Sequence, residues 1–412
     1  MPGFAVYHFS PSIFMRKHLT LLSALLLSTL LTFAQNTSKT PMGPPKGDVA
    51  SAPGRWTAAK ANAWYARQPF LFGANYNPAN TINELEFWQA ETFDPATIDK
   101  ELTLAENMGI NTMRVFLHDL PYQQDAKGFI SRIDRFLTIC QKHKIRPMLV
   151  LFDSCWDPYP KLGKQRDPMP GIHNSGWVQS PGAEALTDVS QYPRLEAYVK
   201  GVVGAFRNDQ RVLMWDIWNE PDNTNDNSYG ENHTIRTELP KAKKIAIIEN
   251  LLPQAFAWAR SVQPVQPLTS GVWQFWRNNW SDSGTIPSFD LMQLSNSDVI
   301  TFHQYADAPA LEKIIAGLKK MGRPVICTEF MARGVNSRFQ THLPIARREK
   351  VGMICWGFVA GKSQTYLPWD SWQKPYVDGR EPSIWFHEIL KNDGTPYIAE
   401  EITAIKQAMG KQ

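Results

Sequence analysis

Two glutamates each stand at the end of a short apolar segment, where a carboxyl group can act as an acid, a base or a nucleophile. Val212–Trp218 runs towards Glu220 and is stopped by Pro221, and Pro324–Thr328 runs into Glu329. Short apolar runs bounded by proline and polar turn residues predict buried strands. Burial disfavours the charged form of a carboxylic acid and raises its pKa, so each glutamate is a candidate proton donor near neutral pH.

A regular alternation of apolar strands and amphipathic helices surrounds both glutamates. Eight strands are predicted, at Phe70–Tyr76, Thr112–Leu117, Pro147–Phe152, Val212–Trp218, Pro267–Trp273, Val299–Tyr305, Pro324–Phe330 and Gly352–Phe358. Helices are predicted at Asp94–Met108, Ile130–His143, Pro193–Phe206, Pro240–Val262, Ala308–Lys320 and Phe339–Lys350, with a last one near Ile384–Leu390. The helix between the fifth and sixth strands is the least clear. This order is typical of an α/β fold, the (β/α)8 TIM barrel.

A doubly wound open sheet is the alternative arrangement for the same alternation. Such folds normally carry a glycine-rich phosphate loop after the first strand. The chain has Gly73-Ala74-Asn75-Tyr76 at that place, which lacks the pattern. We therefore expect the barrel.

In a barrel, the position of a residue within its strand predicts its role. Side chains at the carboxyl ends of the strands line the active site, and both glutamates occupy such ends. Side chains also alternate between the two faces of a strand. The residues expected to share a face are Asp216, Trp218 and Glu220 on strand four, and Val325, Cys327 and Glu329 on strand seven. Both acids would then point into one pocket.

The ordered set of polar and aromatic residues at these strand ends resembles glycoside hydrolase family 5 and its clan of barrel glycosidases. The resemblance spans about Phe70 to Leu390. Its motifs are Arg114 in strand two, Asn219-Glu220-Pro221 after strand four, His303-Gln304-Tyr305 ending strand six, Glu329 in strand seven and Trp356 in strand eight. The resemblance implies that Glu220 is the acid/base and that Glu329 is the nucleophile.

The chemistry of retaining hydrolysis fits this division of roles. It needs two carboxyls about 5 Å apart, one protonated for the leaving group and one ionised for attack on the anomeric carbon. Arg114 is suited to keep Glu329 ionised, because an opposite charge within about 4–6 Å lowers the pKa of a carboxyl group. Tyr305 can hydrogen-bond the nucleophile, and Asn219 can hold the 2-hydroxyl of the sugar.

Each of these residues also has a structural interpretation. Arg114 can pair with Asp216, which is expected to point the same way. His303 would contact the sugar or the acid/base, or else be a satisfied core histidine. Trp356 would form an apolar floor for the sugar ring, or pack under the barrel mouth. Either glutamate alone could sit in a surface ion pair, but two of them in register favour catalysis.

The end of strand three departs from the family pattern. Many members carry a histidine there, whereas this chain has Leu151-Phe152-Asp153-Ser154-Cys155-Trp156. The contact to the 3-hydroxyl of the sugar is therefore open. Asp153 and His118, which follows strand two, are the two candidates for it.

Long aromatic loops are expected at the same face of the barrel. Trp156 and Trp177 lie in one such loop, and Trp273 and Trp276 lie in another. Flat apolar rings complement the C–H faces of pyranose sugars, while nearby amide and carboxyl groups bind the hydroxyls. We expect an aromatic-lined cleft for a neutral β-linked glycan. The alternative is that these rings pin the loops to the barrel.

The amino-terminal residues are typical of an export signal. Arg16 and Lys17 precede the apolar run Leu19–Phe33, with Thr32 and Ala34 at the positions that a signal peptidase reads. We predict a signal peptide with an upstream extension over residues 1–34, a linker over 35–55 and the catalytic domain over 56–412. An anchor helix, the alternative, would need about 20 apolar residues. The mature protein is expected to be secreted or periplasmic, with no stable membrane insertion.

Composition limits the partners and cofactors. Removing Arg16 and Lys17 with the leader lowers the formal charge from +4 to +2, which argues against nucleic acid or a membrane surface as the main partner. The loop Asp222–Asn232 lacks the glycine and terminal glutamate of a calcium-binding EF-hand loop, so we interpret it as a solvated loop beside the cleft. No cofactor and no metal are expected, and the oligomeric state is open. The four cysteines, Cys140, Cys155, Cys327 and Cys355, are typical of buried free thiols.

We therefore expect a retaining β-glycoside hydrolase that acts on a β-linked polysaccharide or oligosaccharide of glucan, mannan or xylan type. Two alternatives share its fold. One is a transglycosylase, which uses the same glutamates with a sugar as acceptor. The other is a non-catalytic glycan-binding barrel, which would have no need of both glutamates. Endo or exo action depends on how the long loops close over the cleft.

Overall fold

The computed structural model describes residues 49–225, 239–274 and 286–411. Four predicted features lie wholly or partly outside these residues: the leader over 1–34, the linker up to residue 48, Trp276, and residues 226–232 of the Asp222–Asn232 loop. At the end of the predicted linker, Arg55 is buried and its guanidinium donates to the carbonyl of Ser297 at 2.7 Å. The segment around Arg55 therefore packs against the catalytic domain.

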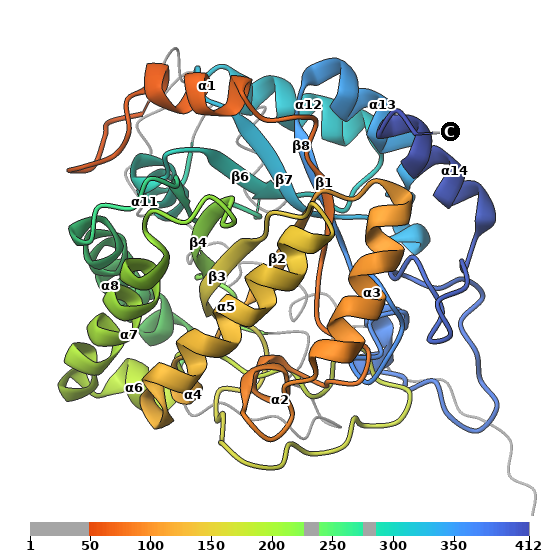
Figure 1. Ribbon diagram of the computed structural model, residues 1–412, viewed down its shortest axis with the longest axis horizontal. Helices are drawn as coiled ribbons and strands as arrows, with labels where there is room; N and C mark the ends of the chain where they lie inside the picture. The colour runs from red at the N-terminus through yellow and green to blue at the C-terminus, as the bar shows by residue number, and fades with distance from the viewer. Residues whose placement is uncertain (1–48, 226–238, 275–285, 412) are drawn as a thin grey trace, which may run out of the picture. The chain divides into compact units, whose positions relative to one another are not determined.

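Eight parallel strands form one sheet that curls into a barrel (Figure 1). They are β1 (Phe72–Asn75), β2 (Thr112–Phe116), β3 (Met148–Asp153), β4 (Met214–Asn219), β5 (Leu268–Thr269), β6 (Ile300–His303), β7 (Val325–Phe330) and β8 (Gly352–Trp356). Their order in the sheet is β5-β4-β3-β2-β1-β8-β7-β6, and a parallel bridge from Val272 to Phe302 joins the two edges. The eight predicted strands and the TIM barrel are confirmed.

Helices cover the outside of the barrel (Figure 1). The six helices predicted between the strands are present as α3 (Pro95–Met108), α5 (Ala126–Lys142), α7 (Tyr192–Phe206), α8 (Lys241–Ser261), α12 (Ala308–Lys319) and α13 (Phe339–Glu349). The unclear region between β5 and β6 contains α11 (Ser288–Asn296). Further helices are α1 (Ala58–Ala66), α2 (Glu84–Trp88), α4 (Asp119–Gln124), α6 (Ala183–Thr187) and α14 (Ala399–Ala408).

Local sequence signals set the ends of these helices. In α3, the side chain of Asp94 accepts hydrogen bonds from two backbone amides of the first turn, and Pro95 is the first helical residue. Gly109 ends the same helix in the left-handed conformation, at φ 86. Asp307 caps α12 in the same way as Asp94 caps α3. Aspartate caps, an early proline and a final glycine are the preferred residues at these positions.

The hydrophobic core has two main parts. The larger lies between the sheet and the helices and contains strand residues such as Val115 and Ile217. A smaller cluster inside the barrel contains Met148 and Met214 and includes Trp64 of α1. Apolar packing thus closes the amino-terminal end of the barrel, which leaves the carboxyl end for polar side chains.

The helix predicted near Ile384–Leu390 is wrong, because this segment forms no helix and α14 is the next helix in the chain. The guanidinium of Arg333, which pairs with Glu401 of α14, donates hydrogen bonds into the segment. Its acceptors there are the backbone carbonyls of Trp385, His387 and Glu388. In a helix these carbonyls would accept hydrogen bonds from backbone amides. Here they accept from Arg333 instead, which satisfies them without a helix.

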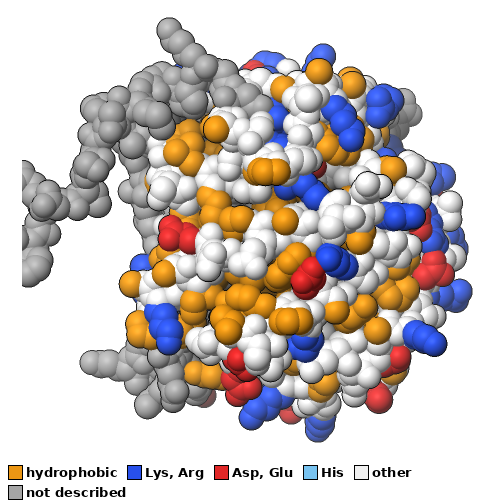
Figure 2. Space-filling model, turned by 90° about the vertical axis from the view of Figure 1, so that its left-hand side faces the viewer, with side chains coloured by type: hydrophobic (Ala, Val, Ile, Leu, Met, Phe, Trp, Pro, Cys, Tyr) orange, Lys and Arg blue, Asp and Glu red, His pale blue; other side chains and the backbone are white. Residues whose placement is uncertain are grey.

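The described helices and the distribution of surface charge can be compared with the partners predicted for this chain. Among the described residues, none of the helices combines the length and the apolar character needed to cross a bilayer. On the side of the domain that carries α7 and α8, basic and acidic side chains are scattered between separate hydrophobic patches (Figure 2). This mixture agrees with the small formal charge of the chain.

Candidate active site

The carboxyl end of β4 departs from strict alternation. Asp216 lies inside the barrel, where it accepts hydrogen bonds from Arg114. Trp218 instead packs on Phe152 with ring centroids 4.9 Å apart, and both rings belong to the layer between the sheet and the helices. The prediction that Asp216 and Trp218 share a face is therefore wrong. Asn219 is the residue that turns inward, since it accepts a hydrogen bond from Arg114 at 2.7 Å.

The carboxyl end of β7 contains a similar irregularity. Val325, Cys327 and Phe330 all belong to the layer between the sheet and the helices. The register between β7 and β8 shifts between Cys327 and Phe330, and a bulge of this kind changes which face the residues occupy. Glu329 therefore does not share a face with Cys327, and that predicted set is wrong. Glu329 still reaches the barrel interior, because the extra residue turns it inward towards Arg114.

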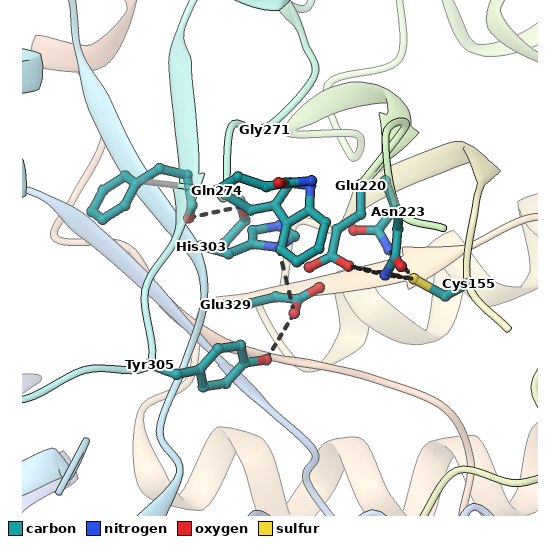
Figure 3. Close-up of polar contacts among 12 residues, drawn as sticks. Cys155, Glu220, Asn223, Gly271, Gln274, His303, Tyr305 and Glu329 are labelled. Carbon is teal, nitrogen blue, oxygen red and sulfur yellow. Dashed lines mark hydrogen bonds and ion pairs between the residues drawn. The ribbon is translucent and has the colours of Figure 1, made fainter. Parts of the chain in front are cut away.

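The structure brings Glu220 and Glu329 together (Figure 3). One carboxylate oxygen of each, together with a ring nitrogen of His303, lies within 4.8 Å of the others. His303 Nδ1 is 2.9 Å from Oε1 of Glu220 and 3.5 Å from Oε2 of Glu329. The two glutamates are 9% and 5% exposed. Both acids thus converge on one point, as the sequence predicted.

Arg114 connects the strand ends beneath the two glutamates. Its Nη1 donates to Oε1 of Glu329 and to Oδ1 of Asn75, both at 2.9 Å. Its Nε and Nη2 donate to Oδ2 of Asp216 at 3.0 and 2.8 Å, and Nη2 also donates to Asn219. Both interpretations of Arg114 are therefore present in one side chain: an ion pair with Asp216 and a contact to Glu329.

Glu329 lies in a charged and hydrogen-bonded environment. The hydroxyl of Tyr305 donates to its Oε2 at 2.7 Å, while Arg114 donates to its Oε1. Burial raises the pKa of Glu329 above its ordinary value, and the Arg114 charge and the Tyr305 hydrogen bond limit that rise. Arg114 thus acts in the direction expected from the sequence, although burial is the larger effect.

Glu220 lies among neutral donors from the loops after β3 and β4. Asn223 Nδ2 donates to its Oε2 at 2.7 Å, and the thiol of Cys155 donates to the same oxygen at 3.5 Å. The ammonium group of Lys244 donates to the carbonyl of Asn223 at 2.8 Å and fixes this loop from below. The backbone of Glu220 has φ 41, a left-handed conformation that costs a non-glycine residue about 1–3 kcal/mol and is concentrated at functional sites.

His303 is a neutral imidazole near pH 7, because burial lowers its pKa to about 4. A neutral ring has one donor and one acceptor nitrogen. Nδ1 faces Glu220, so it can either donate to that carboxylate or accept its proton. Of the three interpretations offered by the sequence, the contact to the acid/base candidate is present.

Asp153 supports other site residues. Its Oδ1 accepts from Asn219 Nδ2 at 2.8 Å and from the amide of Cys155 at 3.0 Å, and its Oδ2 accepts from Trp177 Nε1 at 2.6 Å. Burial raises the pKa of Asp153 to about 6, against the effect of these hydrogen bonds. Three protein donors therefore engage the carboxyl group that the sequence offered for the 3-hydroxyl of the sugar.

His118, the other candidate for the 3-hydroxyl, has both ring nitrogens engaged. Nδ1 accepts from the amide of Leu120 at 3.1 Å, at the start of α4. Nε2 lies 3.1 Å from the carbonyl of Gln179, in the loop after β3. His118 therefore ties α4 to this loop.

The aromatic residues fall into two groups. Trp177 and Trp356 pack edge to face on Phe116, with centroids 5.2 and 6.1 Å away, and Trp356 is partly exposed at the end of β8. Trp156 packs on Trp372 at 5.7 Å. In the first group Trp356 keeps exposed surface that a sugar could contact, whereas Trp177 is buried, and the second group joins two loops.

Trp273 and Trp276 were predicted to bring aromatic rings from the loop after β5. Trp273 Nε1 donates to Oδ1 of Asp222 at 2.6 Å, which links this loop to the one after β4. Trp276 lies outside the described residues. Trp273 thus has the loop-pinning contact that the sequence offered as the alternative role.

Four residues of the site were missed. Asn75 ends β1 as Asn219 ends β4, so the strand-end rule could have found it. Asn223 lies three positions after Glu220, in the loop that we interpreted as solvated. Cys155 is free and buried, as all four cysteines were predicted to be, but it also touches Glu220. Lys244 reaches the site from a helix distant in sequence, for which no local signal exists.

Glu220, His303 and Glu329 are also the group, within the described part of the chain, whose spacing would permit a metal ion. Arg114 lies 2.9 Å from Glu329, and its permanent charge opposes a second cation there. Tyr305 occupies the other oxygen of that carboxylate. This donor set fits acid–base chemistry better than it fits metal binding.

Comparison with known families gives one match over most of the chain. The family model described as cellulase (glycosyl hydrolase family 5) matches residues 71–375. Comparison with curated protein sequences finds no match.

Solved structures share the fold at low identity. An exo-β-1,4-mannosidase from Opitutaceae bacterium strain TAV5 has TM-score 0.53 and 18% identity, with 90% of this chain and 62% of that chain covered. The protein GH5_18 from Streptomyces cattleya, in complex with GlcNAc, has TM-score 0.53 and 13% identity, with 82% and 79% covered. An endo-β-1,4-mannanase from Thermotoga petrophila has TM-score 0.51 and 15% identity, with 84% and 77% covered. The chain thus spans less than two thirds of the length of the mannosidase chain.

Proposed function

The chain belongs to glycosyl hydrolase family 5 and is a glycosidase, and from that premise we propose that it hydrolyses a β-linked glycan with retention of configuration at the anomeric carbon. Glu220 acts as acid and then as base, and Glu329 is the nucleophile. The observation that carries this proposal is the separation of the two carboxyl groups.

Their separation distinguishes the two mechanisms of glycoside hydrolysis. Retaining enzymes hold the carboxyls about 5–5.5 Å apart, and inverting enzymes hold them about 6.5–9.5 Å apart to leave room for a water molecule. In this chain one oxygen of Glu220 and one of Glu329 lie within 4.8 Å of each other. This short distance supports direct attack by Glu329.

In the first step, Glu329 forms a bond to the anomeric carbon while the glycosidic bond breaks. The leaving oxygen takes a proton from Glu220. Oε2 of Glu220 already accepts from Asn223 and Cys155, so Oε1, which faces His303, is the oxygen that carries this proton. In the second step, Glu220 removes a proton from water, the water oxygen attacks the anomeric carbon, and Glu329 leaves as a carboxylate.

The neighbours of Glu329 suit its role as nucleophile and leaving group. Arg114 and Tyr305 both stabilise the ionised carboxylate, which is the form that attacks and the form that is released. Asn219, fixed between Arg114 and Asp153, is positioned for the 2-hydroxyl of the sugar.

We assign a neutral β-linked polysaccharide or oligosaccharide of glucan, mannan or xylan type as the substrate. The charge of Arg114 is offset by Asp216 and Glu329, so this cation is already paired and is not available to an acidic sugar. The partly exposed ring of Trp356 offers an apolar surface to a pyranose. Two of the solved structures with this fold are a β-1,4-mannosidase and a β-1,4-mannanase. We therefore include β-mannan among the substrates to be tested.

The test measures wild type, Glu220→Ala and Glu329→Ala on soluble β-glucans, β-mannans, xylans and aryl β-glycosides, with azide as an external nucleophile and a chelator as a control. We expect wild type to cleave one substrate class, with or without the chelator. Glu220→Ala should yield a β-glycosyl azide, because Glu329 is intact, whereas Glu329→Ala should yield an α-glycosyl azide.

Three other results would replace the proposal. Inverted products from wild type would exclude Glu329 as a nucleophile. Longer glycans in place of hydrolysis products would identify a transglycosylase. Binding without turnover, equal in wild type and both variants, would identify a glycan-binding barrel.

We also propose that the protein is exported, because of the basic and apolar residues of its leader. Expression of the full chain in a bacterium should give a mature protein that starts near residue 35 and is found outside the cytoplasm. Mass spectrometry of the amino terminus tests this. An intact terminus in the cytoplasmic fraction would refute it.

A further inference from the structure

Three loops at the carboxyl end of the barrel are joined to one another. They are residues 76–83 after β1, 154–182 after β3 and 357–376 after β8, and we call them together the three-loop wall. Each pair of loops is linked by a hydrogen bond: Asn83 Nδ2 to the Gly176 carbonyl (2.9 Å), the Asn174 amide to the Ser363 carbonyl (2.8 Å) and the Lys362 amide to the Ala79 carbonyl (2.9 Å). The wall therefore closes the β1 and β8 side of the site.

The wall is packed like a protein interior. His173 is 2% exposed, its Nδ1 lies 2.9 Å from the Leu367 carbonyl, and its amide donates to Ser371 Oγ at 2.9 Å. A Cβ atom at Gly361 would lie 2.1 Å from the Ala79 carbonyl oxygen, so the first and third loops approach more closely than any other residue would permit. These contacts define a fixed boundary.

A hollow lies between this wall and the end of β8, and its interior has room for about one water-sized group. Its lining includes Asn75, Phe116, Asn174, Trp177, Trp356 and Glu388. The hollow is therefore too small for a whole sugar ring, but it can receive a hydroxyl group of a sugar that lies over the partly exposed ring of Trp356.

Buried polar atoms of the lining lack partners among the described residues. They are Oδ1 of Asn77, Oδ1 of Asn174 and Oε2 of Glu388. The other oxygen of Glu388 accepts from Thr365. Burial raises the pKa of Glu388 to about 7, so its free oxygen can accept or donate near neutral pH. Sugar hydroxyls are both donors and acceptors, and they would satisfy such atoms.

The strand order determines which part of a substrate would enter the hollow. Glu220 follows β4, which lies across the barrel from β1 and β8. The proton donor must lie beside the oxygen of the leaving group, so the leaving group lies on the β4 side. The sugar attacked by Glu329 then extends in the other direction, towards Trp356 and the wall.

We propose that the wall ends the site one sugar beyond the cleaved bond, so that the enzyme is exo-acting and removes the non-reducing terminal sugar, whose hydroxyls bind Asn174 and Glu388. This inference rests on the retaining glycosidase function proposed above. Each cycle consumes one water molecule and releases one monosaccharide and a chain shortened by one unit.

The first test uses a pentasaccharide of the preferred linkage, labelled at its reducing end, and the same compound blocked by a 4,6-O-benzylidene group on its terminal sugar. We expect monosaccharide from the start, label that appears in the tetrasaccharide and then the trisaccharide, and no cleavage of the blocked compound. Early internal cleavage, or equal cleavage of the blocked compound, would overturn the exo assignment.

An aryl β-glycoside of one sugar separates this inference from the function on which it rests. Turnover of the aryl glycoside together with internal cleavage of the pentasaccharide overturns exo action alone. Failure to turn over either compound, under conditions where the protein is folded, overturns the proposed function and this inference with it.

The second test asks whether Glu388 contacts the terminal sugar. Glu388→Gln keeps the size of the side chain, and Glu84→Gln is the matched control, because Glu84 is a buried carboxyl without partners among the described residues and outside the hollow. We expect Glu388→Gln to raise KM about tenfold on the aryl glycoside, and the control to leave it unchanged.

Deoxy substrates distinguish a sugar contact from a structural effect. Wild type should lose about tenfold in kcat/KM on the 4-deoxy or the 6-deoxy aryl glycoside, as expected for one hydrogen bond. Glu388→Gln should lose no more on that deoxy compound than it already loses on the parent. If removal of the hydroxyl lowers kcat/KM by the same factor in Glu388→Gln and in wild type, the proposed contact is wrong. It is also wrong if wild type has the same kcat/KM on the deoxy compound and on the parent.

Discussion

Glu220 and Glu329 meet at one point but have different surroundings. Glu220 accepts from an amide and a thiol and faces a neutral imidazole, whereas Glu329 contacts a guanidinium and a phenol. Two groups of the same type gain opposite roles when their environments favour different protonation states. The guanidinium belongs to Glu329, the proposed nucleophile, whereas the neighbours named for Glu220, the proposed acid/base, are all neutral.

The two surroundings also differ in what holds them. The partners of Glu329 come from β2 and the end of β6, which are parts of the barrel itself. Of the partners of Glu220, His303 belongs to β6, whereas Cys155 and Asn223 come from the loops after β3 and β4, and Lys244 secures the second of these loops from α8. The proposed nucleophile is thus held by partners on or beside the strands, while the proposed acid/base also depends on the packing of two loops. This difference leads to four predictions, in order of decreasing effect.

Replacing each glutamate by glutamine separates the two roles. Glu329→Gln should abolish turnover of every substrate, because no bond to the anomeric carbon can form. Glu220→Gln should lower turnover of natural glycosides by about 10²–10⁴-fold, the usual contribution of a general acid, yet spare glycosylation by a dinitrophenyl glycoside, whose leaving group needs no proton. Pre-steady-state release of dinitrophenol measures the difference. If Glu220→Gln lowers the rate of glycosylation equally with natural and dinitrophenyl glycosides, Glu220 is not the general acid.

Removing Arg114 should affect both stability and the pH profile. Arg114→Met leaves Asp216 and Glu329 buried without their cation, which costs about 3–5 kcal/mol of unfolding free energy. The pKa of Glu329 should rise, because the opposing charge is lost, so the acid limb of kcat/KM moves to higher pH.

Arg333→Met is the matched control for Arg114→Met. Arg333 forms an equally buried ion pair with Glu401, but none of its hydrogen bonds or ion pairs reaches Glu220 or Glu329. Denaturant unfolding should show a similar loss of stability in both variants, and only Arg114→Met should shift the acid limb. A shift of the same size in Arg333→Met would mean that the pH profile reports stability.

Tyr305→Phe should move the same limb by a smaller amount. Glu329 must be ionised to attack, so activity falls as the pH drops through its pKa, and removal of a donor to the carboxylate raises that pKa. A hydrogen bond to a charged group contributes about 1.5–3 kcal/mol, which corresponds to about one to two pH units. Tyr198→Phe, which loses a buried hydroxyl bonded to the Leu151 carbonyl, should leave the limb in place.

Asn223→Ala should give the smallest of the four effects. It removes one neutral donor from Glu220, and hydrogen bonds of this kind contribute about 0.5–1.5 kcal/mol, or up to about tenfold in rate. The loss should appear in kcat/KM for substrates with poor leaving groups and be absent for dinitrophenyl glycosides. An equal loss on both would show that Asn223 supports the fold of the loop instead of the acid.

The sequence was sufficient for the barrel and for the convergence of the two glutamates. Strand and helix periods differ enough to be recognised along the chain, the strand-end rule located both acids, and the family resemblance located Arg114. Two predicted strand faces are wrong, because Trp218 packs outward and Glu329 follows a bulge. Bulges depend on how neighbouring strands pair, which no single segment specifies.

Other features depended on partners distant in sequence. The segment Ile384–Leu390 has a helical composition, but Arg333 takes its carbonyls. Lys244 lies 24 residues after Glu220, and Glu388 lies 59 residues after Glu329. No local sequence pattern marks either of them as part of the site. The sequence therefore predicts where chemistry occurs more readily than it predicts what holds each side chain in place.

The ion pair of Arg333 with Glu401 has a consequence for the order in which the molecule is made. Arg333 holds the segment that carries Glu388, and Glu401 lies in α14, which leaves the ribosome after every strand of the barrel. A domain generally folds as a unit. The segment that carries Glu388 can therefore reach its final place only after every strand of the barrel and α14 have been synthesised.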